Sequence, residues 1–195
     1  MLTSRDLALI AMFTGVIAAL GLIPAVAPFG AAVPITAQSM GVMLAGAILG
    51  SKRGALAVLL FLGLVAIGLP LLSGGRGGLG VFAGPSVGYL VGFPVAAWLV
   101  GRLTELLGRP YRVTLGVMAN VLGGVLVLNV IGILGMALVA DLSLVRATTV
   151  AAVFIPGDLV KAVLTALVAV GVHAAYPGLI PARRERTATT PRVHA

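Results

Sequence analysis

The chain has 195 residues, of which 60% are hydrophobic and 9% are charged. Soluble domains carry about 25% charged residues, so this composition excludes an ordinary water-soluble domain and indicates a protein of the lipid bilayer. A net charge of +8 would suggest a nucleic-acid partner for a soluble protein, but in a membrane protein the positions of the charges matter more, and we expect no nucleic-acid partner. The sequence contains no cysteine, which excludes disulfide bonds and thiolate metal sites.

Six apolar segments, separated by short polar or Gly/Pro-rich stretches, predict an all-α integral membrane bundle of six transmembrane helices. A helix needs about 20 residues to cross the hydrocarbon core. The predicted helices cover residues 7–23, 35–50, 54–72, 87–107, 113–140 and 148–176. The second is short for a full crossing, and Pro156 is expected to break the sixth, because proline removes a helical hydrogen bond.

The basic residues alternate between the two sides of this arrangement. If the N-terminus is cytoplasmic, two basic residues, Arg76 and Arg146, lie outside, and Lys161 lies within a helix. The cytoplasmic side then holds Arg5, Lys52, Arg53, Arg102, Arg109, Arg112, Arg183, Arg184, Arg186 and Arg192. The positive-inside rule predicts this alternation for six helices with both termini in the cytoplasm. We therefore expect a multi-pass protein of the plasma membrane.

The predicted helices form one membrane domain, residues 1–176. The remaining segment, residues 177–195, is basic, contains proline and threonine and lacks apolar periodicity. We expect it to be a disordered cytoplasmic tail, for which contact with anionic lipids is the functional alternative.

Residues 74–93, GGRGGLGVFAGPSVGYLVGF, contain two patterns known from enzymes. Residues 75–80 fit the dinucleotide fingerprint G-x-G-x-x-G, but that motif needs a βαβ unit, whereas the preceding segment here is an apolar membrane helix. Residues 84–88 fit the nucleophile elbow G-x-S-x-G, but the predicted topology places Ser86 and His173 on opposite sides of the membrane, so no base is in reach. We therefore expect neither an enzyme nor a bound cofactor.

This glycine-rich segment is predicted to be an outer loop between the third and fourth helices. Irregular backbone at membrane depth persists only where it is buried in protein or lines a cavity. Glycines let backbone N–H groups approach a ligand, and the following helix N-terminus favours anions. Leu79, Val81, Phe82 and Tyr89 are interleaved with the glycines, which favours a lid over an apolar pocket rather than a flexible surface loop.

Two charged residues fall inside the last apolar stretch, FIPGDLVKAVL. Asp158 and Lys161 are three residues apart and therefore share one helix face. A charge at the bilayer centre costs about 2.5–3.5 kcal/mol on insertion scales, and such residues are by default candidates for function. The alternative is an ion pair that satisfies itself at a helix interface. We interpret the pair as part of a site that faces a cavity in the outward half of the membrane.

Other polar residues in apolar surroundings are Thr36 and Gln38, which follow Pro34, and the two asparagines of the fifth predicted helix. Asn120 and Asn129 are nine residues apart, about 180° around an ideal helix, so only one of them can face a central pocket. The other is expected to form an interhelical hydrogen bond.

The first predicted helix carries a stripe of small residues, Ala11, Gly15 and Ala19. Small residues at this spacing let two helices pack closely. The stripe is expected to pack either within the bundle or against a partner protein.

Three blocks of the sequence resemble the BioY family, the substrate-binding S components of energy-coupling-factor biotin transporters. They are PITAQSMGVMLAGAILGSKRG (34–54), GLPLLSGGRGGLGVFAGPSVGYLVGF (68–93) and PGDLVKA (156–162). The resemblance extends over about residues 7–176. The family pattern in the second block reads closer to GPTGGYL, so Ser86 and Val87 depart from it.

The resemblance implies a six-helix protein that captures biotin from outside with high affinity. It also implies a transmembrane T component and ATPase subunits as partners, which pass the ligand inward. A stand-alone or oligomeric secondary transporter is the alternative. The membrane Asp and Lys of the family match Asp158 and Lys161, and its glycine-rich third loop matches residues 74–86. The partner-interface residues are then Ala11, Gly15 and Ala19.

The chemistry of biotin suits these residues. An aspartate can accept hydrogen bonds from the ureido N–H groups, a lysine can donate to the ureido oxygen, and loop N–H groups with Arg76 can hold the carboxylate. Aromatic side chains, with Trp98 among them, would cover the apolar ring and chain. The expected substrate-binding residues are Asp158, Lys161, Arg76, Gly78, Phe82, Tyr89, Gln38, Thr36 and Asn120.

Overall fold

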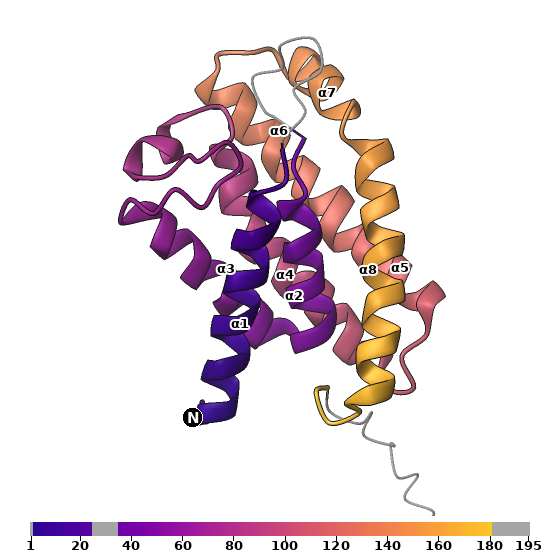
Figure 1. Ribbon diagram of the computed structural model, residues 1–195. Helices are drawn as coiled ribbons and strands as arrows, with labels where there is room; N and C mark the ends of the chain where they lie inside the picture. The colour runs from indigo at the N-terminus through magenta and orange to yellow at the C-terminus, as the bar shows by residue number, and fades with distance from the viewer. Residues whose placement is uncertain (1, 25–34, 181–195) are drawn as a thin grey trace, which may run out of the picture.

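The computed structural model describes residues 2–24 and 35–180, and within these two ranges the chain is helical and forms no β-sheet. The helices pack side by side into a bundle, shown in Figure 1. In chain order they are α1 (Ser4–Gly21), α2 (Gln38–Leu49), α3 (Ser51–Ala66), the 3₁₀ turn η2 (Leu79–Ala83), α4 (Val87–Leu107), α5 (Val113–Asn120), the π-helical η3 (Val121–Val127), α6 (Leu128–Val139), α7 (Leu144–Ala152) and α8 (Ile155–Ala175).

Four of these helices are long and apolar enough to cross a membrane. They are α1, α4, the continuous helix Val113–Val139 made of α5, η3 and α6, and α8. The helix α2 is apolar but has only 12 residues. The all-α fold is therefore confirmed, while the six membrane crossings stay a prediction.

Two of the predicted helices end differently in the structure. The third ends at Ala66 rather than at residue 72, because Gly68 has φ +109° and Pro70 follows, neither of which continues a helix. The sixth divides into α7 and α8. The break predicted at Pro156 is present. This proline lies in the first turn of α8, where backbone N–H groups make no intrahelical hydrogen bond, so its lack of an N–H costs the helix nothing.

The helix α4 lies in the middle of the bundle and packs against α2, α3 and α6. Glycines make these contacts close. A Cβ atom at Gly46 of α2 would overlap the backbone of α4, and a Cβ at Gly88 of α4 would lie 2.6 Å from the carbonyl oxygen of Ile131. Without a hydrophobic drive between helices in lipid, such close van der Waals contact is what holds helices together.

Both described ends of the chain lie at the same end of the bundle, where α1 begins and α8 finishes (Figure 1). Arg53 joins them: its guanidinium lies 3.3 Å from Oδ1 of Asp6 and also donates to the backbone carbonyl of Leu179. Leu179 and Ile180 are buried, so these two residues of the predicted tail pack against the bundle. Residues 181–195 lie outside the described ranges, and the domain boundary at 176 stays a prediction.

The outward surface of the bundle is apolar, as a lipid-facing surface requires. On α8 the outward residues, each 42–59% exposed, are Leu159, Val160, Val163, Leu164, Leu167 and Val168. A soluble protein rarely exposes an apolar surface of this extent.

Candidate substrate-binding site

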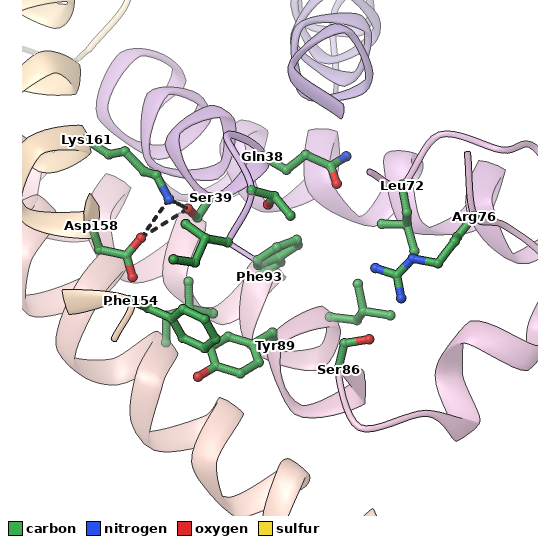
Figure 2. Close-up of a pocket in the computed structure, with 14 residues that line it drawn as sticks. Gln38, Ser39, Leu72, Arg76, Ser86, Tyr89, Phe93, Phe154, Asp158 and Lys161 are labelled. Atoms are coloured by element: carbon green, nitrogen blue, oxygen red, sulfur yellow. Dashed lines mark hydrogen bonds and ion pairs between the residues drawn. The ribbon is translucent and has the colours of Figure 1, made fainter. Parts of the chain in front are cut away.

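A pocket lies between α2, α4, α6, α8 and the loop that joins α3 to α4 (Figure 2). It is in the half of the bundle remote from the chain ends, since it is built by the first turns of α2, α4 and α8. Helix N-termini carry partial positive charge, so three of them around one pocket favour an anionic group. The lining residues are Ile35, Thr36, Gln38, Ser39, Leu72, Arg76, Ser86, Tyr89, Leu90, Phe93, Leu128, Phe154, Asp158 and Lys161.

Asp158 and Lys161 form an ion pair at one side of the pocket. Nζ of Lys161 lies 2.9 Å from Oδ1 of Asp158 and 3.0 Å from Oγ of Ser39 on α2 (Figure 2). The Ser39 hydroxyl lies 3.4 Å from the same carboxylate oxygen. Asp158 is only 5% exposed, and a charge buried to this degree needs such partners. The pair is thus both internally satisfied and part of the pocket lining.

The second carboxylate oxygen of Asp158 is reached from the opposite helix. Nδ2 of Asn129 lies 3.5 Å from Oδ2 of Asp158, and the Tyr89 hydroxyl lies 3.2 Å from Oδ1 of Asn129. A hydrogen-bonded chain therefore runs from Tyr89 through Asn129 to Asp158. The predicted site residue Asn120 is not part of it: this side chain is fully buried and donates to the carbonyl of Ala162, away from the pocket lining.

The sequence could not decide between the two asparagines because the helix between them is irregular. The π-helical η3 occupies Val121–Val127, and its wider turns alter the angle that an ideal helix would set between the two positions. Ser39 was missed for a different reason, since one serine in an apolar helix gives no signal of its own.

Aromatic side chains form the apolar wall of the pocket. The rings of Tyr89 and Phe154 meet edge to face, with centroids 5.7 Å apart, and Phe93 lies between them and the loop (Figure 2). Phe82 is partly buried but does not line the pocket. Trp98 is 47% exposed on the outer surface of α4. Phe93 and Phe154 were not expected from the sequence, although Phe93 follows Tyr89 by one helical turn.

Gln38 connects the glycine-rich loop to two helices. Its Oε1 accepts from the backbone N–H of Ser73 at 3.1 Å, and its Nε2 donates to the carbonyls of Leu71 at 3.0 Å and Ile17 at 3.4 Å. The amide thus has its hydrogen bonds within the protein. Gln38 lines the pocket, and these contacts indicate that it positions the loop, while its predicted role in substrate binding stays a prediction.

Arg76 lies across the pocket from the ion pair (Figure 2). Its backbone pairs with that of Leu72, and Gly74 and Gly75 take φ values of +81° and +68° in the turn between them. Only glycine adopts such angles without strain. Gly78 does not line the pocket, and its N–H donates to the carbonyl of Val65 at 2.8 Å. Thr36 does line it.

The pocket has a cavity volume of ≈60 Å³. Ordinary small-molecule sites measure about 300–1,000 Å³. A small organic ligand therefore fits only after the walls move apart, and the loop that carries Arg76 is the wall without a continuous helix behind it.

The small-residue stripe of α1 faces outward. Ala11, Gly15 and Ala19 are all exposed, and a Cβ at Gly15 would meet no atom of another described element within 4 Å. Within the described ranges, Gly15 therefore packs against no other helix, which leaves this face free for lipid or for a partner.

Together, the bundle and its pocket define a helical membrane protein that encloses a small-ligand site with an ion pair at one side and a guanidinium at the other. The sequence profile of the BioY family matches residues 1–178. This chain belongs to the BioY family.

Named relatives match over nearly their whole length. A protein named biotin transporter BioY from Rhodobacter capsulatus is 51% identical over 189 residues, which cover 92% of this chain and 98% of the relative. A protein of the same name from Rhizobium etli is 48% identical over 188 residues, covering 93% and 100%. A solved structure, described as the S-component for biotin from an ECF-type ABC transporter, is similar with a TM-score of 0.82 and 31% identity, covering 89% of this chain and 95% of that chain.

Proposed function

We propose that this protein is the membrane subunit that captures biotin for uptake by the cell. Family membership supports this proposal, because the relatives are named for biotin transport, which is transport rather than catalysis. The observation that carries it is the pairing of Asp158 with Lys161 at one side of a pocket that holds Arg76 at the other.

The two sides of the pocket suit the two polar ends of biotin. The Asp158 carboxylate can accept from ureido N–H groups, and the Lys161 ammonium can donate to the ureido oxygen. Arg76, with the positive end of α4 beside it, can hold the carboxylate. Tyr89, Phe93 and Phe154 then cover the apolar bicycle and chain between these ends.

Ligand binding can be tested with a cycle of variants and analogues. Radiolabelled biotin should bind to the purified protein at one saturable site per chain. Biotin amide lacks the carboxylate, so Arg76→Gln should weaken biotin binding but leave binding of the amide nearly unchanged. Absence of saturable biotin binding, or equal competition by an unrelated carboxylate of similar length, would contradict the proposal.

The proposed setting is the plasma membrane, with six crossings and both termini in the cytoplasm. The charge distribution supports it, as does the location of both described chain ends at one end of the bundle. A label at Arg146→Cys should be reachable only from outside, and one at Arg112→Cys only from the cytoplasm.

The proposed partners are a transmembrane T component and two ATPase subunits, with the outer face of α1 as the docking surface. A relative in structure is described as part of an ECF-type ABC transporter, which supports this assignment. Gly15→Leu should abolish co-purification with a T component and leave biotin binding intact, because Gly15 contacts no other described helix. Loss of binding as well would point to a role in the bundle. Uptake by cells that contain this chain alone, with and without the partners, tests the alternative of a stand-alone or oligomeric transporter.

A further inference from the structure

A second cavity lies at the end of the bundle where α1 begins and α8 finishes (Figure 1). Its volume is ≈480 Å³, within the range of about 300–1,000 Å³ that small-molecule sites have. Its walls are the loop between α4 and α5, residues 108–111, and the last turns of α8 with the residues that follow them. The proposed capture of biotin uses none of the lining residues, so the size and chemistry of this cavity call for a separate explanation.

The guanidinium of Arg109 is fixed at this cavity but not neutralised. It donates to the backbone carbonyl of Ile180, and both residues line the cavity. Among the described residues no carboxylate forms an ion pair with Arg109, since the three pairs present join Asp6, Glu105 and Asp158 to other basic side chains. A guanidinium has five N–H donors in a fixed fork. The bond to Ile180 therefore leaves donors and a full positive charge for an anion.

The aromatic part of the wall is held by contacts between three elements. Nε2 of His173, on α8, lies 2.9 Å from the backbone carbonyl oxygen of Ala47, on α2. The ring of Tyr111, in the loop before α5, stacks on His173 with centroids 4.9 Å apart. The described lining contains no carboxylate, so an anion meets no like charge there. A wall that is already in place lets a ligand bind with a smaller loss of freedom.

The rest of the lining is apolar and leads toward the lipid-facing surface. Its apolar residues are Val170, Ala174, Pro177 and Ile180. Leu167 and Val168, each 50% exposed, precede them on the outward face of α8. A free anion gains nothing from such surroundings, whereas the glycerol backbone and acyl chains of a lipid bury apolar surface against them. The cavity therefore suits an amphiphile with an anionic head.

The cavity also lies at the depth of a lipid headgroup. Tyr176, which is 64% exposed, stands between two lining residues of α8, and tyrosine is enriched where a membrane meets water. Lys52 and Arg112 are exposed at the same end of the bundle. The predicted topology makes this the cytoplasmic side. Anionic lipids are concentrated in that leaflet, and basic pockets between transmembrane helices there bind their headgroups.

The chain itself supplies a rival occupant, namely the segment that follows Ile180. Its first charged residues are Arg183, Arg184 and Arg186, against a single acid, Glu185. Charges of the same sign repel, so Arg109 disfavours a segment of this net charge and favours an anion.

We propose that the cavity lined by Arg109, Tyr111 and His173 binds the headgroup of an anionic phospholipid. Arg109 donates to the phosphate, and the acyl chains follow the outward face of α8. A lipid bound there contacts both the α4–α5 loop and the end of α8, and it stabilises the contact between them. The inference does not depend on the ligand of the pocket beside Asp158.

The test uses the purified full-length protein in detergent, with phosphatidylglycerol or phosphatidylcholine of the same acyl chains as probes. Native mass spectrometry counts the lipid molecules that stay bound, and thermal unfolding measures their effect on stability. We expect one molecule of phosphatidylglycerol to be retained in preference to phosphatidylcholine. It should also raise the unfolding midpoint, because a ligand that binds the folded state stabilises it.

Two pairs of variants locate the bound lipid. Arg109→Gln should weaken retention of phosphatidylglycerol about ten- to a hundredfold, the loss of a charge-assisted hydrogen bond. Arg112→Gln removes the same charge from the same loop but outside the lining, so retention should fall about fivefold at most. Ala174→Trp fills the cavity without changing its charge and should abolish preferential retention. Ala175→Trp, outside the lining, should leave it unchanged.

Equal losses in Arg109→Gln and Arg112→Gln would overturn the proposal, because they would show a general attraction to negative charge. Absence of preferential retention by the unmodified protein, as expected if residues after Ile180 fill the cavity, would overturn it too. Displacement of the lipid by inorganic phosphate at equal concentration would indicate a site for a free anion and overturn the lipid assignment. If Arg109→Gln fails to fold, the comparison of Ala174→Trp with Ala175→Trp decides. A protein that retains the lipid but binds no biotin refutes the proposed function alone.

Discussion

The two sides of the pocket are built in different ways. On the α8 side, Asp158, Lys161, Ser39 and Asn129 come from three different helical segments and hold one another by hydrogen bonds. On the loop side, Arg76 is exposed, and among the described residues its side chain bonds to the carbonyl of Ser73 alone, at 3.2 Å. The first side is organised before any ligand arrives, whereas the second is a loop held by Gln38 and by the bond from the Gly78 N–H to Val65.

This difference assigns separate tasks to the two sides. A preorganised set of charges distinguishes one polar group from another, because it loses little freedom on binding. A loop that can shift lets a ligand pass into a pocket of ≈60 Å³. We therefore expect substitutions on the α8 side to abolish recognition of the ligand. Substitutions on the loop side should alter the entry of the ligand into the pocket and the binding of its carboxylate.

The largest effect is expected when both members of the ion pair are replaced. Asp158→Asn with Lys161→Met should weaken biotin binding about ten- to a hundredfold, since a charge-assisted hydrogen bond contributes about 1.5–3 kcal/mol. The double variant should stay folded, because removing a buried pair together is often neutral. Lys161→Met alone is the control, and it should destabilise the fold by about 3–5 kcal/mol. A folded double variant with unchanged affinity would refute the site.

A smaller effect is expected from Arg76→Gln. Its guanidinium is exposed, so solvent weakens its hold on a carboxylate, and we expect about a tenfold loss of biotin affinity. Equilibrium binding at low and high salt provides the check: the wild-type affinity should fall with salt more steeply than that of the variant. Parallel salt dependences would mean that Arg76 does not contact the ligand.

Gln38→Leu should loosen the loop and leave the ion pair intact. The variant loses the bonds to Ser73, Leu71 and Ile17, each worth about 0.5–1.5 kcal/mol. Limited trypsin digestion after Arg76 measures the release of the loop, and it should become faster while biotin affinity falls about threefold to tenfold. Thr149→Val, outside the pocket lining, should change neither quantity. Unchanged digestion would show that Gln38 does not hold the loop.

The smallest effect is expected from Tyr89→Phe. This change keeps the ring against Phe154 and removes only the hydroxyl that reaches Asn129. One neutral hydrogen bond is worth about 0.5–1.5 kcal/mol, so affinity should fall about twofold to tenfold. Calorimetry on the purified variant can resolve this loss. A loss as large as that of the double variant would place Tyr89 in direct contact with the ligand.

The helix side of the pocket was the more predictable of the two. Asp158 and Lys161 can be recognised as candidate site residues from the sequence, because charges in an apolar helix are costly and their spacing puts them on one helix face. Thr36, Gln38 and Tyr89 line the pocket, and their contact with a substrate stays a prediction. The choice of asparagine did not follow from the sequence, since the π-helical turns between Asn120 and Asn129 leave no clear signal.

The loop side depended on tertiary contacts that no local pattern encodes. The glycines predicted a loop that lies close over a pocket. They did not predict that the N–H of Gly78 would donate a hydrogen bond to the carbonyl of Val65. The sequence also gave no means of deciding whether Phe82 or Phe154 forms part of the apolar wall of the pocket. Such choices depend on how the 3₁₀ turn and the start of α8 meet in space.

The contacts of Arg53 carry a consequence for how the protein is made. Asp6 belongs to α1, whereas Leu179 follows α8. A single side chain that contacts both can complete its contacts only after α8 and Leu179 have been synthesised. The end of the bundle where α1 begins therefore lacks this contact until Leu179 has been added, and a nascent chain that stops before Leu179 would leave Arg53 with Asp6 alone.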